Sequence, residues 1–169
     1  VDPTHDVKDL DSLLDALDSK VNISEDLIIL PGMVADSLAH ASPWDNIHDK
    51  LLIDATTPME GDPRNKRDSL KGCPESLEVS VSGIEGVEQA RFLRSSMLVV
   101  TTKIEGGPSP DENVEVNDEE GALKQRSKIQ RIMDSVWNLE GATNLRWLFI
   151  TDSDVDLLEE GWMRVLLWQ

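Results

Sequence analysis

Four short apolar runs, separated by helical or polar sequence, are the feature that most constrains how this chain can fold. They are 27–30 (LIIL), 50–55 (KLLIDA), 97–104 (MLVVTTKI) and 146–151 (RWLFIT). Their length and β-branched content are typical of strands. Runs that are apolar on both sides of the chain indicate strands buried under helices on two faces. The sequence therefore predicts an α/β fold, a three-layer sandwich with a mostly parallel sheet flanked by helices.

The segments around these runs carry helical periodicity. The first helix is predicted from Asp6, which we expect to cap it, with Asp9 three residues later near the spacing of a capping box. Its apolar stripe consists of Val7, Leu10, Leu13, Leu14 and Leu17. A second helix is predicted over 124–139, ended by Gly141, and a third over 154–169.

Two further segments are assigned from weaker patterns. Residues 77–81 alternate weakly between apolar and polar side chains and predict an edge strand. Pro31-Gly32 is expected to end the first strand. The polar and acidic segment 106–121, with two prolines and three glycines, predicts a flexible loop.

Both ends of the sequence indicate a segment of a longer polypeptide. Val1 stands directly before the first helix, as if it were the last residue of a strand. The apolar helix predicted at the other end stops at Gln169 without a cap or a stop signal. We therefore expect residues 1–169 to form a single α/β domain that is one part of a larger protein.

Charge and cysteine content exclude several classes of function. The formal net charge is −17, which disfavours binding to nucleic acid or to an anionic membrane surface. The apolar runs are far shorter than the roughly 20 residues that cross a bilayer, so no transmembrane segment is predicted. Cys73 is the sole cysteine, which rules out an internal disulfide and fits a reducing cytoplasm.

Asp152, Asp154 and Asp156 are candidates for a metal site, because carboxylates two residues apart suit Mg²⁺ or Ca²⁺. The spacing fails as an EF-hand, since Leu157 and Met163 stand where that loop needs glycine and glutamate. A metal-dependent transferase using Asp152 and Asp154 remains an alternative. Capping of the following helix by Asp154 is the favoured interpretation.

Lys50 begins a strand that we expect to be buried, and Asp54 lies where that strand ends. Lys50 either extends its amine to solvent from an apolar surface or reaches an anion. Asp54 lies where strands of α/β sheets present groups to ligands, or it hydrogen-bonds the turn at Thr56-Thr57. Taken alone, these residues favour the structural interpretation.

Three motifs in fixed order nevertheless carry a resemblance to a known family. They are the first helix, the loop 37–43 (SLAHASP) and the strand 50–56 (KLLIDAT). Together they resemble the C-terminal domain of the UbiD family, prenylated-flavin-dependent and reversible decarboxylases that act on polyprenyl-hydroxybenzoate and related aromatic or unsaturated acids. The chain departs from the family's pattern at three positions. Asp15 stands where tryptophan is usual, Lys20 stands near the family's arginine, and Leu52 stands where glycine is usual.

The resemblance implies that this chain is the C-terminal lobe of a carboxy-lyase, inactive by itself, that closes the active site and contributes oligomer contacts. It implies that prenylated FMN, a divalent metal such as Mn²⁺ and the catalytic residues belong to an N-terminal flavin-binding domain of the same polypeptide. In this chain it implies no catalytic or metal-binding residue, and it places Lys50 near the flavin phosphate. It also implies a cytoplasmic homo-oligomer in ubiquinone or menaquinone biosynthesis. The alternative is a non-catalytic α/β interaction module.

Overall fold

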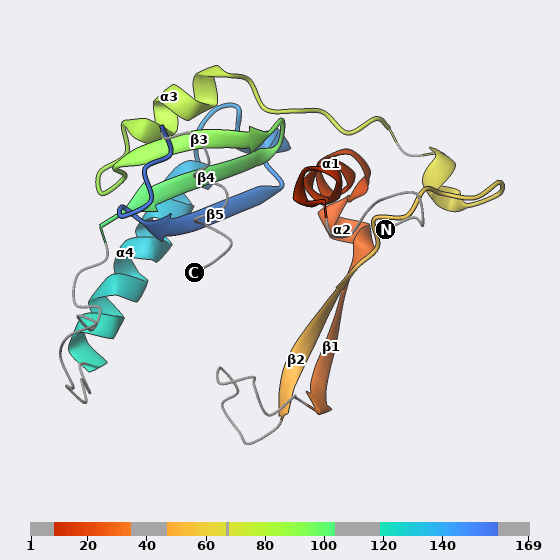
Figure 1. Ribbon diagram of the computed structural model, residues 1–169, viewed down its shortest axis with the longest axis horizontal. Helices are drawn as coiled ribbons and strands as arrows, with labels where there is room; N and C mark the ends of the chain where they lie inside the picture. Colours follow the sequence, from red (N-terminus) through yellow and green to blue (C-terminus); the bar gives the residue numbers. More distant parts are fainter. Residues whose placement is uncertain (1–8, 35–46, 67, 104–118, 159–169) are drawn as a thin grey trace. The chain divides into compact units, whose positions relative to one another are not determined.

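The computed structural model describes residues 9–34, 47–66, 68–103 and 119–158, and the chain divides into two compact units, 1–70 and 71–169 (Figure 1). Helices and strands occur in both units, which confirms the predicted α/β class. Each unit is described below by itself, and the single domain over 1–169 stays a prediction. Of the helices in the described ranges, none is long and apolar enough to cross a membrane.

The first unit begins with helix α1, Leu10–Lys20. Its N-cap is Asp9, whose side chain accepts a hydrogen bond from the Asp11 N–H at 3.2 Å and satisfies one of the free donors of the first turn. Leu14 and Ala16 are the buried residues of the helix. Asp6, expected to be the cap, lies outside the described residues, as does Val7 of the predicted stripe. A single-turn helix α2, Ile23–Asp26, leads into the first strand.

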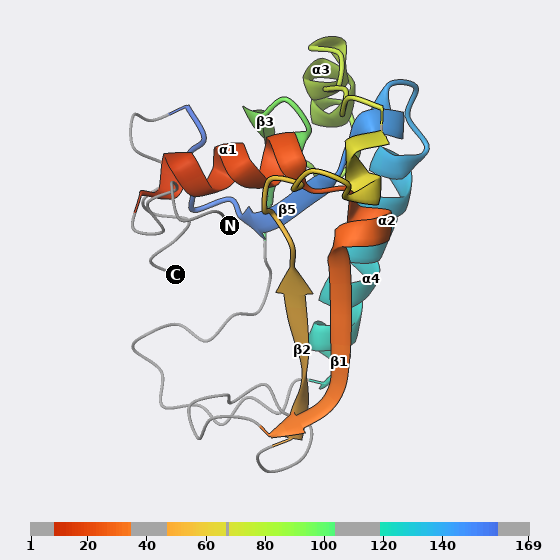
Figure 2. The ribbon, with the colours of Figure 1, turned by 90° about the vertical axis from the view of Figure 1, so that its right-hand side faces the viewer.

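Strands β1, Leu27–Val34, and β2, Ile47–Ile53, form an antiparallel two-stranded ribbon in which Leu27 lies opposite Ile53 (Figure 2). The prediction that Pro31-Gly32 ends the first strand is wrong. β1 continues past this pair through a bulge between Leu30 and Met33, which an edge strand accommodates because its outer N–H groups need no partner within the sheet. The second strand lies earlier than predicted, so Lys50 falls in its interior.

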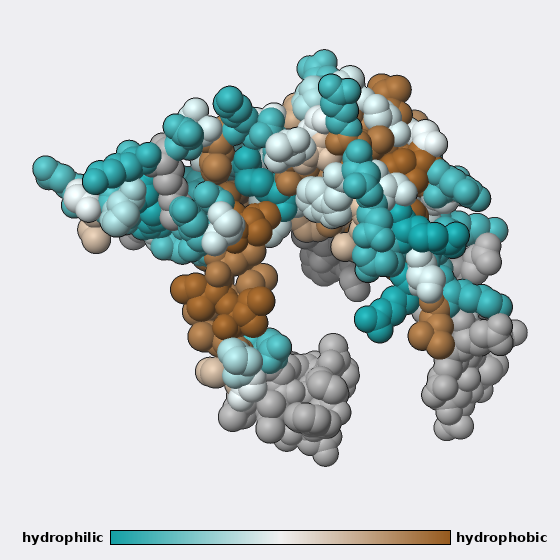
Figure 3. All heavy atoms as spheres, turned by 180° about the vertical axis from the view of Figure 1, so that it is seen from behind, coloured by the Kyte–Doolittle hydropathy of each residue, from teal (hydrophilic) through white to brown (hydrophobic). Residues whose placement is uncertain are grey.

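The prediction that these two strands are buried is also wrong. The exposed fractions are 53% for Ile28, 66% for Ile29, 54% for Leu51 and 49% for Leu52. Figure 3 shows this apolar surface gathered over the ribbon. The reason is topological: the apolar runs pair only with each other in the described part of the unit, and a two-stranded ribbon cannot bury its own faces.

The second unit contains a three-stranded sheet in the order β3–β4–β5, from Gln89–Arg94, Met97–Thr102 and Trp147–Asp152. β3 and β4 are antiparallel and β4 and β5 are parallel. The predicted mostly parallel sheet is therefore corrected, since one of the three strand pairs among the described residues is parallel. β3 was not predicted, because Arg91 and Arg94 interrupt its apolar pattern.

Helices α3, Ser76–Ser82, and α4, Glu119–Trp137, pack on one face of this sheet. The strand predicted over 77–81 is instead helical, and its two fully buried residues, Leu77 and Val81, are one helical turn apart. α4 buries Ile132 and Val136 against Leu98 and Val100 of β4 and the α3 residues. It also begins earlier than predicted, so residues 119–121 of the expected acidic loop are helical; residues 104–118 lie outside the described ranges.

The opposite face of the sheet carries a smaller apolar cluster. Val99 of β4 packs with Val155 and Leu157, which follow β5. Residues 153–158 form turns, so the helix predicted to begin at Asp154 does not begin there. The rest of that prediction, 159–169, lies outside the described residues. Gly141, predicted to end α4, stands four residues after its last residue and begins the short 3₁₀ helix Ala142–Asn144.

Candidate functional site

The turn after β2 is held by Asp54. Its Oδ1 atom accepts hydrogen bonds from the Thr56 N–H at 2.9 Å and from the Thr56 hydroxyl at 2.6 Å. Its backbone N–H donates to the Asp26 carbonyl at 2.9 Å, which joins the end of β2 to α2. Ala55, between the two, is buried. The interpretation of Asp54 as the residue that pins this turn is confirmed.

Arg64 completes this arrangement from the 3₁₀ helix Pro63–Lys66. Its Nη1 atom lies 2.9 Å from Asp54 Oδ2, and its Nη2 atom lies 2.8 Å from Asp62 Oδ2. The Asp62 carboxylate also accepts from the Arg64 backbone N–H at 2.8 Å. Hydrogen bonds to Asp62 raise the pKa of the Arg64 guanidinium above its ordinary value, so it stays charged. The turn is therefore clamped by one cation between two carboxylates.

The end of α1 reaches the same turn. Lys20 Nζ donates to the Thr57 hydroxyl at 3.0 Å. A polar pocket of about 190 Å³ lies beside these groups, lined by Ser19, Lys20, Asn22, Thr56, Pro58, Arg64, Asp68, Ser69 and Leu70. Because Arg64 already faces Asp54 and Asp62, and Asp68 lines the pocket, positive charge is balanced there. The geometry therefore indicates a structural junction of α1, β2 and the 3₁₀ helix.

This junction makes the first unit sensitive to acid. Hydrogen bonds from Thr56, followed by the charge of Arg64, lower the pKa of Asp54 below its ordinary value of 3.8. A carboxyl with a depressed folded pKa stabilises the fold above its unfolded pKa, and that contribution is lost as pH falls through the folded pKa. We expect Asp54→Asn to reduce the acid sensitivity of residues 47–57, measured by amide hydrogen exchange from about pH 6 down to about pH 3. Equal sensitivity in the variant and the parent chain would contradict this role.

Lys50 lies apart from this junction, in the interior of β2 opposite Leu30. Lys50 is exposed, and no carboxylate among the described residues forms an ion pair with it. The neighbouring Asp49 carboxylate accepts from the Gly32 N–H at 3.0 Å, within the ribbon. Lys50 is the sole lysine or arginine in 27–34 and 47–53. It is therefore an accessible cation on a largely apolar ribbon, and its contact with a flavin phosphate stays a prediction.

The acidic sequence 152–156 is used in turns. The Asp152 carboxylate accepts from the Asp154 N–H at 3.0 Å and so closes the turn that follows β5. Asp156 accepts from the Leu158 N–H and from Gln89 Nε2, both at 2.9 Å, and the first of these bonds lowers its pKa. Within the described ranges, no group of three metal-ligating side chains comes together. The prediction that Asp154 caps a helix is therefore wrong, and Asp152 and Asp156 instead hold turns through their side chains.

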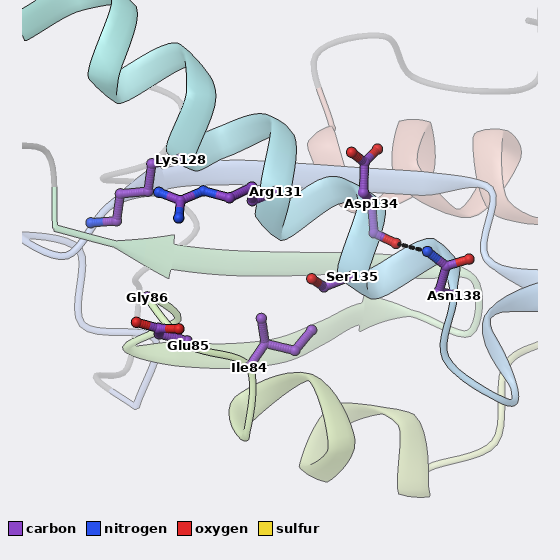
Figure 4. Close-up of a pocket in the computed structure, with 8 residues that line it drawn as sticks. All are labelled: Ile84, Glu85, Gly86, Lys128, Arg131, Asp134, Ser135 and Asn138. Atoms are coloured by element: carbon purple, nitrogen blue, oxygen red, sulfur yellow. Dashed lines mark hydrogen bonds between the residues drawn. The ribbon is translucent and has the colours of Figure 1, made fainter.

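A second groove lies in the unit 71–169, between α4 and the loop after α3 (Figure 4). It encloses about 410 Å³ and is lined by Ile84, Glu85, Gly86, Lys128, Arg131, Asp134, Ser135 and Asn138. Lys128 Nζ donates to the Lys103 carbonyl at 2.7 Å, and Asn138 donates to the Asp134 carbonyl at 2.8 Å. Two cationic and two anionic side chains line it, so their formal charges balance.

Two of the residues that organise these regions were missed from the sequence. Arg64 was missed although Asp62-Pro63-Arg64 carries a local signal, since aspartate before proline favours a turn that its own side chain closes. Gln89 was missed because its partners, Asp156 and Leu157, are 67 and 68 residues away. A contact of that sequence separation leaves no mark in local periodicity.

Comparison with known proteins finds one family match and two relatives for parts of this chain. Residues 1–55 match the family described as the 3-octaprenyl-4-hydroxybenzoate carboxy-lyase C-terminal domain. The chain is 35% identical over 79 residues to a phenolic acid decarboxylase of Streptomyces sp. (strain D7), a match that covers 46% of this chain and 17% of that protein. It is 45% identical over 64 residues to a phenolic acid decarboxylase of Escherichia coli O157:H7, covering 38% of this chain and 14% of that protein.

No solved structure matches the chain significantly. The chain spans only a small part of the length of the two phenolic acid decarboxylases. The family match ends at Ala55, in the turn held by Asp54. The matched segment contains α1, the ribbon and Lys50. Residues 1–55 are therefore similar to the C-terminal domain of the UbiD family, a family of decarboxylase type, as the resemblance predicted.

Proposed function

We propose that this chain is the C-terminal lobe of a UbiD-type carboxy-lyase that decarboxylates aromatic acids of the phenolic type. The observation that carries the proposal is the match of residues 1–55 to the family, supported by two relatives that are named phenolic acid decarboxylases. The lobe acts together with a flavin-binding domain of the same polypeptide, and its part is to close the active site and exclude water. By itself it has no turnover.

The cofactors of the proposed enzyme are prenylated FMN and a divalent metal such as Mn²⁺, held mainly by that other domain. When bound, the modified flavin supplies the electron sink for loss of CO₂. Among the described residues, Lys50 fits one feature of this cofactor, its phosphate, because it is an exposed cation on an apolar strand. The Asp54–Arg64 junction fixes the end of the strand that carries Lys50. Homo-oligomerisation, a cytoplasmic location and a role in quinone biosynthesis complete the proposal.

The test is decarboxylation by the complete polypeptide that carries residues 1–169. It is expressed with a source of prenylated flavin and Mn²⁺, and CO₂ release is measured from a panel of hydroxybenzoic and hydroxycinnamic acids. We expect turnover with the complete polypeptide and none with residues 1–169 alone. Turnover by residues 1–169 alone, or none by a flavin-loaded complete polypeptide, would overturn the proposal.

Replacing Lys50 by methionine should weaken flavin retention about tenfold or more, because a hydrogen bond between a charged group and a phosphate contributes about 1.5–3 kcal/mol. Retention is measured by flavin absorbance after gel filtration of the complete polypeptide. Lys50→Arg keeps the charge and should retain most of the flavin. Lys66→Met, which removes an exposed lysine from the 3₁₀ helix of the same unit, is the matched control. Equal retention by Lys50→Met and Lys66→Met would remove Lys50 from the cofactor site.

A further inference from the structure

The sheet of the unit 71–169 has two edge strands, β3 and β5, and the described residues protect the first of them (Figure 1). The Phe92 N–H of β3 donates to the Glu78 carboxylate of α3 at 2.8 Å, so this edge donor already has a partner. Arg91 and Arg94 place two charges on the strand, and a bulge between Phe92 and Arg94 interrupts its pairing with β4. Charged side chains and bulges keep an edge strand from pairing further, so the edge at β3 is closed.

The edge at β5 has no such protection among the described residues. No charged residue lies between Trp147 and Thr151. The Trp147 N–H donates to the Ser96 carbonyl at 3.1 Å, which directs the odd-numbered residues of β5 toward β4. Because the backbone groups of successive strand residues point to opposite sides, Leu148 and Ile150 direct their N–H and C=O groups away from β4. No hydrogen bond in the described part of the chain satisfies these outward groups.

The side chains of β5 make this edge apolar as well as open. Leu148 and Ile150 pack against the main core on one face of the sheet, and Phe149 packs against the smaller cluster on the other. All three remain partly exposed. An open apolar edge is a template for a further strand, which gains main-chain hydrogen bonds and side-chain contacts on alternate faces. β5 is therefore an interaction edge, and it lies outside the family match over residues 1–55.

We infer that β5 pairs antiparallel with β5 of a second copy of this chain, about a two-fold axis at Phe149. This inference goes beyond the proposed function and rests on it only for the expectation of a homo-oligomer. A two-fold axis brings the same edge of both copies together, as a symmetric dimer requires. Outward-pointing residues must meet each other to exchange hydrogen bonds. The central registers therefore place Leu148 opposite Ile150, opposite its own counterpart, or opposite Asp152.

Charge complementarity selects the first of these registers and identifies the occupant. In that register Arg146 lies opposite Asp152 twice, once at each end of the paired segment. Phe149 meets its counterpart on the axis, and both opposite charges and aromatic pairs stabilise neighbouring strands. The second register sets Arg146 against the apolar Ile150. The third sets Asp152 against Leu148.

The edge is thus complementary to its own reverse, which favours a second copy of this chain over an unrelated strand. The net charge of −17 opposes association of two copies at long range. At physiological ionic strength, charges on the surface that are more than about 8 Å apart are largely screened. The short-range pairing of the two edges is therefore not prevented by the acidity of the whole chain.

The first test measures amide hydrogen exchange in the complete polypeptide that carries residues 1–169, at about 0.15 M salt and over about a hundredfold range of concentration. We expect exchange at Leu148 and Ile150 to slow by about tenfold or more as the concentration rises and the molecular mass doubles. Phe149 is the internal control: its N–H faces β4, so it should already be protected at the lowest concentration. Equal protection of all three amides at every concentration would mean that another segment of the polypeptide covers the edge, and would overturn the inference.

A second test places a thiol on the axis. With Cys73 replaced by serine, Phe149→Cys should form a disulfide between copies on mild oxidation, because opposite residues of a non-hydrogen-bonded antiparallel pair have Cα atoms about 4.5 Å apart. Thr151→Cys is the matched control on the same face of β5. Its two copies would lie about four residues apart along the strands, roughly 13 Å, which is too far for a disulfide. Equal cross-linking at the two positions, or none at position 149 in folded protein, would contradict the register.

A third test exchanges the charges at the ends of β5. Arg146→Asp sets aspartate opposite aspartate, so the dissociation constant of the dimer should rise by about tenfold or more. Adding Asp152→Arg restores opposite charges and should return the constant to within about threefold of the parent value. Arg146 also donates to the Lys71 carbonyl at 3.0 Å, and Asp152 accepts from the Asp154 N–H; loss of these local bonds would not be repaired by the exchange. A double variant that folds and does not recover pairing would overturn the inference.

Two further measurements keep the outcomes separate. If a variant fails to fold, as thermal unfolding shows, the exchange measurement on the unmodified protein decides. Decarboxylation by the flavin-loaded complete polypeptide is followed in parallel. A monomer that turns over would overturn the inference and leave the proposed function standing. A dimer paired through β5 that does not turn over would leave the inference standing and overturn the proposed function.

Discussion

Truncation of Leu98 to alanine is expected to destabilise the unit formed by residues 71–169 by about 3 kcal/mol, within the range of roughly 2–5 kcal/mol found for buried leucines. Leu98 is fully buried in β4, the central strand of the sheet, and belongs to the same core cluster as Leu77 and Val81 of α3 and Ile132 and Val136 of α4. Two helices and a strand would have to move together to fill the space left by its side chain. The cavity therefore persists, and its cost adds to the lost transfer free energy.

The measurement is native-state hydrogen exchange of amides in β4 and β5, which reports on this unit without assuming that the whole chain unfolds in one step. Leu123→Ala is the matched control, because it makes the same change on α4 at a side chain that is 63% exposed. We expect that control to lower the free energy of exchange by less than about 1 kcal/mol. Equal losses in the two variants would show that the core is not centred on β4.

The contrast between β4 and the ribbon shows how far periodicity determines this fold. The run at 97–102 and the run at 27–30 are both short, apolar and rich in strand-forming residues, and both form strands. One is buried throughout, whereas the other exposes Ile28 and Ile29. Local sequence determines that each run forms a strand. Whether the strand is buried depends on helices and strands from distant parts of the chain, and a run of four residues carries no information about these.

The error at 77–81 has a different origin. Leu77, Val79 and Val81 alternate as in a strand, but Leu77 and Val81 also have the spacing of one helical turn. The structure resolves the ambiguity, because Val79 is 76% exposed and the other two are fully buried on one helical face. In β3 the sequence conceals a strand, because Arg91 and Arg94 interrupt the apolar pattern. The segment is nevertheless a strand, since it pairs with the apolar strand β4. Where a short segment fits both the helical and the strand period, tertiary contacts determine which of the two structures it adopts.

The residues of the candidate site also divide into those whose role is predictable from the sequence and those whose role is not. The role of Asp54 was readable, because an aspartate followed by two threonines favours a local turn and the bonds it makes are two residues long. Arg64 was ten residues away and Gln89 more than sixty residues from Asp156, so neither connection follows from spacing. The accessible position of Lys50 follows from the pairing of β1 with β2, which the apolar runs alone did not predict.

Gly141→Ala is expected to destabilise the second unit by about 2–5 kcal/mol, through two separable causes. Gly141 has φ of 95°, and a left-handed conformation costs a residue with a Cβ atom roughly 1–2 kcal/mol. A Cβ atom there would also lie 2.7 Å from Pro74 Cγ and 3.3 Å from Pro74 Cδ. The proline ring is rigid and its carbonyl accepts from the Leu77 N–H at the start of α3, so it cannot turn aside, and overpacking adds roughly 1–3 kcal/mol.

Two controls separate the causes. Gly61 has φ of 84° with nothing within 4 Å of an added Cβ atom, so Gly61→Ala should show the conformational cost alone, about 1 kcal/mol, in its own unit. Combining Gly141→Ala with Pro74→Ala removes the clash and keeps the strained backbone. The double variant should therefore be more stable than the sum of the two single changes predicts, by about 1 kcal/mol or more, when exchange of α3 and β4 amides is measured. Additive effects would mean that Gly141 is required for its backbone angle alone and that Pro74 does not confine it.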